Sequence, residues 1–147
     1  MKLSPYLNFE GCASEALELY AKALNSKVNE IHLYNENPEI CKSMPTDWHT
    51  KVMHGNVIAG DITIMASDVM IGEGSPCGNQ PISYQTSPVS LSLGFDSIEE
   101  MEKAFSILSE GGNVTMPLQD TFWGAKFGML DDKFGVKWMF NYDYPKK

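Results

Sequence analysis

The feature of this sequence that most limits its fold is an order of elements that occurs twice. In each half, one strand precedes a helix, and three more strands follow the helix. The first half is expected to contain, in order, a strand at 7–9, a helix capped by Ser14 and ended by Asn25-Ser26, a strand at 28–34, a polar loop at 35–50 and two strands within 51–68 that turn at 59–61. A duplicated supersecondary unit indicates two modules of the same design.

The second half repeats the order after a glycine- and proline-rich connector at 69–88. It is expected to contain a strand at 89–95, a helix capped by Asp96 or Ser97 that runs to about Glu110, and strands at 113–119, 125–132 and 136–143. Half of such a short chain cannot bury one face of a sheet by itself, so the two modules should share a core. The sequence therefore predicts an α+β fold in a single domain, 1–147, with modules at about 1–68 and 89–143.

Charge and composition exclude several classes of function. The formal net charge is −8 and every fixed cation is a lysine, so nucleic-acid binding is not expected, because phosphates would be repelled and bidentate arginine contacts are impossible. The sequence contains no apolar run long enough to span a bilayer and its start lacks the apolar centre of a signal peptide. We therefore expect a cytoplasmic protein without a membrane partner.

Several short motifs give the chain a family resemblance. These are YLNF at 6–9, His54, Ser67-Asp68 and the closing segment "GGNVTMPLQDTFWGAKFGMLDDKFGVKWMFN" at 111–141. They resemble the PhnB-like subgroup of the glyoxalase/bleomycin-resistance/extradiol-dioxygenase group, the vicinal oxygen chelate superfamily. The resemblance implies two βαβββ modules that form a cup-shaped mixed sheet with helices on the outer face. It also implies a homodimer, with or without exchanged modules.

The resemblance implies a divalent metal held by His, Glu or Gln on the first and last strands of each module. Alternation of side chains along the strands places those positions on or within one residue of Ser4, Met65, Ser90 and Met139. Hydroxyls and thioethers are poor ligands for zinc, nickel, magnesium or ferrous iron. We therefore expect no metal and no cofactor at these positions.

Two polar residues leave alternatives open. His54 lies in the middle of a predicted strand and is either a hydrogen-bonded structural histidine, a contact in a ligand pocket, or a catalytic or metal-bound group. Asp68 ends a strand and is interpreted as the start of a turn. The glycine-rich segment 72–78 is not followed by a helix, so it is not expected to bind a nucleotide phosphate.

The aromatic residues of the closing segment divide into two groups. Trp138 and Phe140 are interpreted as core, whereas Trp123 and Phe127 fit either core or pocket wall. The ligand pocket is predicted to be lined by Tyr6, Asn8, His54, Met65, Ser90, Ser92, Trp123, Phe127 and Met139.

These expectations favour a protein that binds a small molecule in a metal-poor cup. The alternative is a metal-dependent lyase, isomerase or dioxygenase of the same superfamily with relocated ligands. A third hypothesis, an interaction protein that acts as a dimer, is compatible with both. Some relatives carry a demethylubiquinone-methyltransferase label, but nothing in the sequence resembles an S-adenosylmethionine site, so we do not adopt this label.

Overall fold

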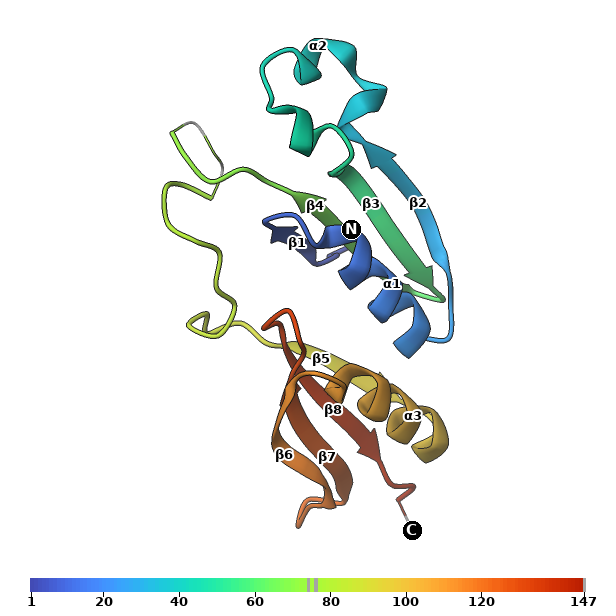
Figure 1. Cartoon of the computed structure of the whole chain (residues 1–147). Coiled ribbons are helices and arrows are strands. Elements are labelled where there is room, and N and C mark those ends of the chain that lie inside the picture. The colour runs from blue at the N-terminus through green and yellow to red at the C-terminus, as the bar shows by residue number, and fades with distance from the viewer. Residues whose placement is uncertain (74, 76, 147) are drawn as a thin grey trace. The chain divides into compact units, whose positions relative to one another are not determined.

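The computed structural model describes residues 1–73, 75 and 77–146. The chain forms two compact units, Met1–Ile82 and Ser83–Lys147, and both contain the predicted order of one strand, one helix and three strands (Figure 1). This α+β architecture of two βαβββ modules confirms the predicted fold class. Among the described residues, no helix combines the length and apolar character that a bilayer span requires.

The first unit is a four-stranded mixed sheet with one long helix. Its elements are β1 (Tyr6–Phe9), α1 (Ala13–Ala23), β2 (Val28–Leu33), β3 (Val52–Ala59) and β4 (Ile62–Asp68), and the strand order is β1-β4-β3-β2. Strands β1 and β4 are parallel, and the other neighbours are antiparallel. Leu7 and Phe9 on β1 are buried, as are Leu17 and Tyr20 on α1. Helix α1 therefore packs on one face of the sheet and leaves the other face without a helix (Figure 1).

The segment between β2 and β3 is more ordered than the predicted loop at 35–50. It contains a 3-10 turn at Tyr34–Glu36, the short helix α2 (Pro38–Cys41) and a second 3-10 turn at Thr46–Trp48. The Asn37 side chain caps α2 by accepting a hydrogen bond from the Ile40 N–H group, and Pro38 occupies the first position of that helix. Proline at the first helical position and asparagine before it both favour the start of a helix. Local sequence signals therefore account for helix α2.

The second unit repeats the same topology. Its elements are β5 (Leu91–Phe95), α3 (Ile98–Ser109), β6 (Asn113–Asp120), β7 (Ala125–Asp131) and β8 (Lys137–Asp143), and the strand order is β5-β8-β7-β6. Ser97 caps α3 through a 3.3 Å hydrogen bond from the Glu100 N–H group to its hydroxyl, which confirms one of the two predicted caps. Trp138 and Phe140 are buried, as the sequence predicts.

A glycine on β7 allows helix α3 and strand β6 to approach closely. A Cβ atom at Gly128 would lie 2.8 Å from Leu118 Cδ2 and 3.1 Å from Phe105 Cε2. Phe105 contacts the buried Phe140 ring edge-on, with 5.0 Å between the ring centroids. The helix-covered face of this sheet is thus close-packed, and the polar side chains of β5 and β8 lie on its opposite face.

The start of helix α1 differs from the prediction. The residue that precedes the helix is Cys12, with no hydrogen bond from its side chain to the first turn, and not Ser14. The first turn is satisfied instead by Asp68, whose Oδ1 accepts hydrogen bonds from the N–H groups of Gly11 and Ala13, both at 2.9 Å. The cap therefore comes from a residue more than fifty positions away, which no local sequence signal reveals.

Candidate functional site

The helix-free face of the first sheet carries a chain of hydrogen-bonded side chains across three neighbouring strands. The Tyr6 hydroxyl on β1 contacts Ser67 Oγ on β4 and lies 3.1 Å from His54 Nδ1 on β3. Ser67 Oγ in turn donates a 2.8 Å hydrogen bond to the carbonyl oxygen of Met53. The Tyr6 and His54 rings are 5.7 Å apart at their centroids. These contacts hold the two rings together on a face that solvent can reach.

This chain has only one consistent direction when the imidazole is neutral. Ser67 has a single hydroxyl hydrogen and uses it on the Met53 carbonyl, so Tyr6 must donate to Ser67 Oγ. The Tyr6 oxygen then has only lone pairs for His54 Nδ1, and Nδ1 must carry the ring hydrogen. The other ring nitrogen, Nε2, is therefore left as an acceptor.

An acidic residue lies next to that nitrogen. Glu30 on β2 places Oε1 4.0 Å from His54 Nε2 and Oε2 3.6 Å from His32 Nε2. Asn56 donates a 3.3 Å hydrogen bond to Glu30 Oε1 and helps to orient it. The face thus presents a carboxylate between two imidazoles, beside the Tyr6 ring.

The second imidazole is paired on its other side. His32 Nδ1 lies 3.1 Å from Glu36 Oε1, and Glu36 Oε2 accepts a 2.6 Å hydrogen bond from the Leu33 N–H group. The hydrogen bond and charge of Glu36, with a smaller contribution from Glu30, raise the pKa of His32 above its ordinary value. The same His32 contact, followed by the bond from the Leu33 N–H group, lowers the pKa of Glu36.

Asp68 supports this face from the core of the unit, and its interpretation as the start of a turn is wrong. The residue is 1% exposed, and besides the N–H groups of Gly11 and Ala13 it accepts a 2.9 Å hydrogen bond from the Val52 N–H group through Oδ2. Its carboxylate therefore connects the end of β1 to the start of β3. A buried carboxylate that accepts hydrogen bonds from three backbone donors holds the strand ends in position.

The helix-free face of the second sheet is lined by methionine, serine and aromatic side chains. Met139 on β8 is in register with Ser92 on β5 and with Met129 on β7. Phe127, two residues before Met129, lies on the same face and is half-buried. Thioethers adapt to irregular shapes, so this face has the chemical character of an adaptable apolar wall.

The turn between β6 and β7 exposes two large aromatic side chains. Phe122 is 98% exposed and Trp123 is 58% exposed, and their rings meet edge-on with 5.0 Å between the centroids. Trp123 also contacts Phe127, at 6.2 Å. Trp123 is therefore not a core residue of this unit, so the first of its two predicted placements is wrong. Ser90 precedes β5 and is likewise exposed.

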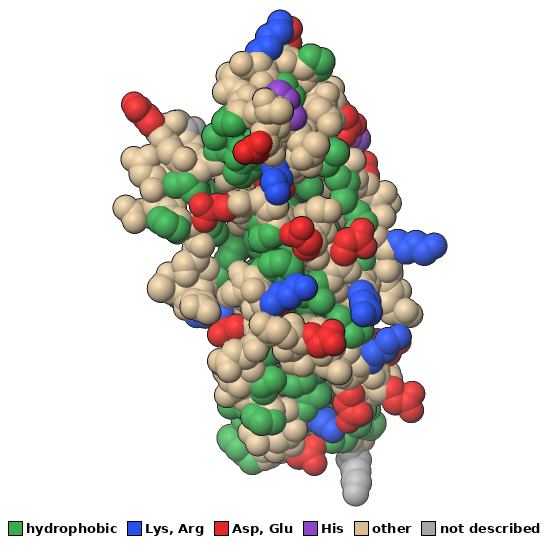
Figure 2. Space-filling model, in the orientation of Figure 1, with side chains coloured by type: hydrophobic (Ala, Val, Ile, Leu, Met, Phe, Trp, Pro, Cys, Tyr) green, Lys and Arg blue, Asp and Glu red, His purple; other side chains and the backbone are tan. Residues whose placement is uncertain are grey.

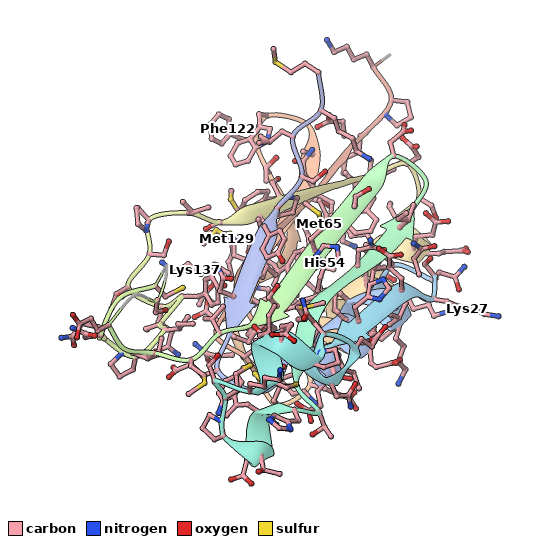
Figure 3. All side chains as sticks on the ribbon, turned by 90° about the horizontal axis from the view of Figure 1, so that it is seen from above. Lys27, His54, Met65, Phe122, Met129 and Lys137 are labelled. Carbon is pink, nitrogen blue, oxygen red and sulfur yellow. The ribbon has the colours of Figure 1, made fainter. Side chains whose placement is uncertain are left out.

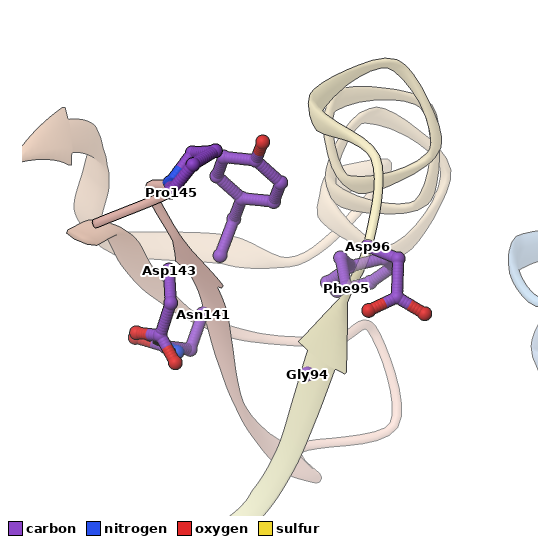
Figure 4. Close-up of a pocket in the computed structure, with 7 residues that line it drawn as sticks. Gly94, Phe95, Asp96, Asn141, Asp143 and Pro145 are labelled. Carbon is purple, nitrogen blue, oxygen red and sulfur yellow. Dashed lines mark hydrogen bonds between the residues drawn. The ribbon is translucent and has the colours of Figure 1, made fainter. Parts of the chain in front are cut away.

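A pocket of about 500 Å³ lies in the second unit at the carboxyl ends of the parallel strands β5 and β8 (Figure 4). The residues that line it are Gly94, Phe95, Asp96, Asn141, Tyr142, Asp143 and Pro145. Asn141 Nδ2 donates a 3.1 Å hydrogen bond to Asp143 Oδ1, which orients that carboxylate. None of the nine residues predicted for the ligand pocket lines this cavity.

The positions at which the resemblance implies metal ligands carry unsuitable side chains. Met65 is half-buried and in register with Tyr6, and Met139 is half-buried and in register with Ser92. Ser4 and Ser90 both lie outside the strands. Thioethers and hydroxyls do not fit a divalent metal centre. Within the described part of the chain, no group of three or more His, Cys, Asp or Glu side chains could hold a metal ion.

The structure therefore brings together part of the predicted set. Tyr6, His54 and Met65 project from neighbouring strands of the first sheet, and Figure 3 labels His54 and Met65 there. Trp123 and Phe127 contact each other in the second unit. Sequence reasoning missed Glu30, although its place two residues before His32 in a predicted strand puts both side chains on one face.

Comparison with known proteins identifies the family. A family model described as 3-demethylubiquinone-9 3-methyltransferase matches residues 1–140. Protein YjdN from Escherichia coli (strain K12) is 35% identical over 148 residues, which cover 96% of this chain and 95% of YjdN.

Solved structures agree with this assignment. Protein PA1353 from Pseudomonas aeruginosa is 37% identical, with a TM-score of 0.77 and coverage of 97% of this chain and 98% of that one. A PhnB protein from Bacillus cereus is 26% identical, with a TM-score of 0.74 and coverage of 97% and 99%. A glyoxalase-related enzyme from Fulvimarina pelagi, only 10% identical, shares the fold with a TM-score of 0.58 and coverage of 97% and 89%. The chain belongs to the family described as 3-demethylubiquinone-9 3-methyltransferase, and it is PhnB-like.

Proposed function

We propose that this protein binds a small molecule on the helix-free face of its first sheet, with Tyr6 and His54 as the recognition pair. The observation that carries the proposal is the hydrogen-bond chain from His54 through Tyr6 to Ser67. It leaves one lone pair of the imidazole, on Nε2, on the side of the ring that faces Glu30, where a ligand donor could bind between the two groups. A polar group held in one protonation pattern on an accessible surface is what specific recognition of a ligand requires.

The surroundings of this pair indicate the kind of ligand. Glu30 contributes a carboxylate, Tyr6 contributes an aromatic ring that is 45% exposed, and Met65 contributes a thioether. A ligand with a hydrogen-bond donor or a positive charge next to a flat apolar part would match these groups. The net charge of −8 would also favour a cationic ligand over an anionic one.

The remaining expectations from the sequence form part of the same proposal. Asn8 belongs to the site on the first sheet, and Ser90, Ser92, Trp123, Phe127 and Met139 contribute a second binding face on the other unit. The protein would act in the cytoplasm as a homodimer with one glyoxalase-like domain, 1–147, in each subunit. Lysine and acidic side chains are interspersed over the face seen in Figure 2, which is consistent with a protein that does not bind nucleic acid.

The alternative is an enzyme of the same superfamily, a lyase, isomerase or dioxygenase with relocated metal ligands. The arrangement of Glu30 between His32 and His54 favours this alternative, because it is the place on the first sheet where imidazole and carboxylate groups meet. The family's description names methyl transfer, so S-adenosylmethionine belongs among the ligands to be tested.

A ligand screen read by protein NMR tests the proposal. The protein, labelled with ¹³C in its methionine methyl groups, would be mixed with sets of aromatic amines, neutral aromatic acids and S-adenosylmethionine. Binding on the first sheet should shift the Met65 methyl signal, assigned through Met65→Leu. His54→Ala and Tyr6→Phe should each weaken binding about tenfold, since the first removes the imidazole that accepts a hydrogen bond from the ligand and the second removes the hydroxyl that orients this imidazole.

The matched control is His49→Ala, because His49 Nε2 lies within hydrogen-bond distance of the backbone carbonyl oxygens of Cys41 and Met44, in the segment after β2 and not on the sheet. This variant should bind as the wild type does. A ligand whose affinity is unchanged in His54→Ala and Tyr6→Phe, or that leaves the Met65 signal in place, would contradict the proposed site.

A further inference from the structure

The tautomer of His54 leaves two hydrogen-bond acceptors next to each other on the first sheet. Because Nδ1 carries the hydrogen of the neutral ring, Nε2 has only a lone pair, and Glu30 Oε1 lies 4.0 Å from it. Two acceptors cannot bond to one another, so a donor is required between them. Asn56 donates to Glu30 Oε1 at 3.3 Å, but a carboxylate oxygen accepts more than one hydrogen bond. Both acceptors can therefore serve a donor from outside the chain.

Strand register and neighbouring side chains position the two acceptors. His54 on β3 is paired directly with His32 on β2, and Glu30 is paired with Asn56. Paired residues project from the same face of a sheet, and residues two positions apart along a strand share that face. Tyr6 holds the His54 ring through Nδ1. Asn56 orients Oε1 of Glu30, and His32 Nε2 lies 3.6 Å from Oε2. The two acceptors are thus held in place by their own partners.

The separation fits one nitrogen atom that carries at least two hydrogens. An N–H hydrogen bond is about 2.9 Å long, so a single nitrogen can bond to both atoms across the 4.0 Å gap without movement of either side chain. The two bonds would diverge by about 90°, and the N–H bonds of an ammonium group diverge by about 109°. A hydroxyl group has only one hydrogen to donate, and a quaternary ammonium group has none. Neither of these groups can satisfy both acceptors.

The charges of this cluster favour a cation. The hydrogen bond and charge of Glu36, with a smaller contribution from Glu30, raise the pKa of His32. Two carboxylates therefore flank one imidazolium, and His54 adds no charge in its neutral form. The cluster keeps a net negative charge in either protonation state of His32. The side chains of Glu30 and His54 are 45% and 33% exposed, so a ligand can reach both.

We propose that this site recognises a protonated primary or secondary amine, whose nitrogen lies between His54 Nε2 and Glu30 Oε1 and donates to both. The apolar part of the ligand would lie against Tyr6, whose ring is 45% exposed and 5.7 Å from the His54 ring. This inference rests on the proposed function and narrows it to one chemical class. A ligand that binds through Tyr6 and His54 alone can be neutral, whereas the bridge to Glu30 requires a cation with two N–H groups.

A series of benzyl compounds tests the number of N–H groups at constant charge. Benzylamine, N-methylbenzylamine, N,N-dimethylbenzylamine and benzyltrimethylammonium are all cations at neutral pH, and they carry three, two, one and no N–H groups. The Met65 methyl signal of the full chain reports their affinity. We expect it to fall about tenfold between the second and the third compound, because one charge-assisted hydrogen bond is lost. Benzyl alcohol, which is neutral, should bind at least about tenfold more weakly than benzylamine.

Substitutions identify the two acceptors. Glu30→Gln keeps an acceptor oxygen and removes the charge, so it should weaken benzylamine binding about tenfold and leave benzyl alcohol binding unchanged. The matched control is Glu39→Gln, because Glu39 is an exposed carboxylate of the same unit that pairs with Lys42, and this variant should bind every compound as the wild type does. Benzylamine should also move the ¹⁵N signal of His54 Nε2, as donation to an imidazole nitrogen does, and leave the His49 signals in place.

The outcomes separate this inference from the proposed function. Binding that shifts Met65 and depends on His54, but is equally strong for benzylamine and benzyltrimethylammonium, would overturn the inference and leave the proposed function standing. A benzylamine affinity that is unchanged in Glu30→Gln would overturn the inference as well. So would a folded wild type that does not bind benzylamine, whereas the proposed function is decided by the wider set of ligands.

Discussion

The Tyr6 hydroxyl on β1 and the His54 imidazole on β3 are 3.1 Å apart although strand β4 lies between their strands in the sheet. Tyr6 spans that strand by lying over Ser67, which is 5% exposed and whose hydroxyl bonds to the Met53 carbonyl. A tyrosine is long enough to make this connection, and its hydroxyl can both donate to Ser67 and accept from His54. This relationship sets the tautomer of the histidine.

The tautomer of His54 gives the first prediction. At a pH where the ring is neutral, the hydrogen should reside on Nδ1, and Tyr6→Phe should shift the population toward the Nε2–H form. Long-range ¹H–¹⁵N NMR of the histidine rings measures both forms directly, and the His49 ring should be unaffected. A neutral His54 that carries its hydrogen on Nε2 in the wild type would contradict the direction of the chain.

Replacement of the buried carboxylate of Asp68 should destabilise the first unit strongly. Asp68→Asn puts an amide NH₂ group where one carboxylate oxygen now accepts backbone hydrogen bonds from Gly11, Ala13 or Val52. We expect the free energy of unfolding to fall by about 3 kcal/mol, because the variant loses charge-assisted hydrogen bonds and also buries one amide donor without an acceptor. Urea denaturation measures it. The exposed turn residue Asp61 provides the control, and Asp61→Asn should cost less than about 0.5 kcal/mol.

The turn after helix α3 should not tolerate a methyl group. A Cβ atom at Gly112 would lie 2.2 Å from the carbonyl oxygen of Asp131 and 3.0 Å from the backbone of Asp132. Gly112→Ala should therefore lower the free energy of unfolding by about 1–3 kcal/mol, because the backbone of β7 would have to move. At Gly94 nothing lies within 4 Å of such an atom, so Gly94→Ala is the matched control. Thermal unfolding of the two variants should separate them, and equal midpoints would contradict the predicted clash.

Tyr144 should ionise at higher pH than an ordinary tyrosine. Its hydroxyl donates a 2.5 Å hydrogen bond to Asp120 Oδ1, and this bond, followed by desolvation and the charge of Asp120, raises the pKa of Tyr144. Because the folded state favours the neutral phenol, the stabilisation is fully present below the unfolded pKa of about 10 and is lost as the pH rises through the folded pKa.

Ultraviolet titration of the tyrosines should reveal this late ionisation. In Asp120→Asn the amide replaces the carboxylate, so the Tyr144 titration should return toward the ordinary range and the stability curve above pH 10 should become flatter. Tyr144→Phe identifies the transition that belongs to this residue. An unchanged titration in Asp120→Asn would show that the carboxylate does not hold the hydroxyl in solution.

Local patterns determined the elements and their faces. Alternation along β8 places Trp138 and Phe140 in the core and Met139 on the opposite face, and the observed burial follows it. The cap at Ser97 was predictable, because the hydroxyl bonds to an N–H group only three residues away. Side-chain direction along a strand, and a cap within one turn, depend on neighbours in the sequence alone.

The tertiary structure decided which distant residues meet. Asp68 is the last residue of a strand, where the sequence predicts the start of a turn. Its role as the cap of α1 arises because the parallel pairing of β1 and β4 brings its carboxylate to Gly11 and Ala13. The pairing of His32 with His54, and the approach of Glu30 to both, likewise depend on the register of β2 and β3, which includes two irregular steps. One residue of slip would turn these side chains to the other face. The sequence by itself therefore determined the elements and which side chains share a face, whereas strand register, a property of the folded sheet, decided which of them form a site.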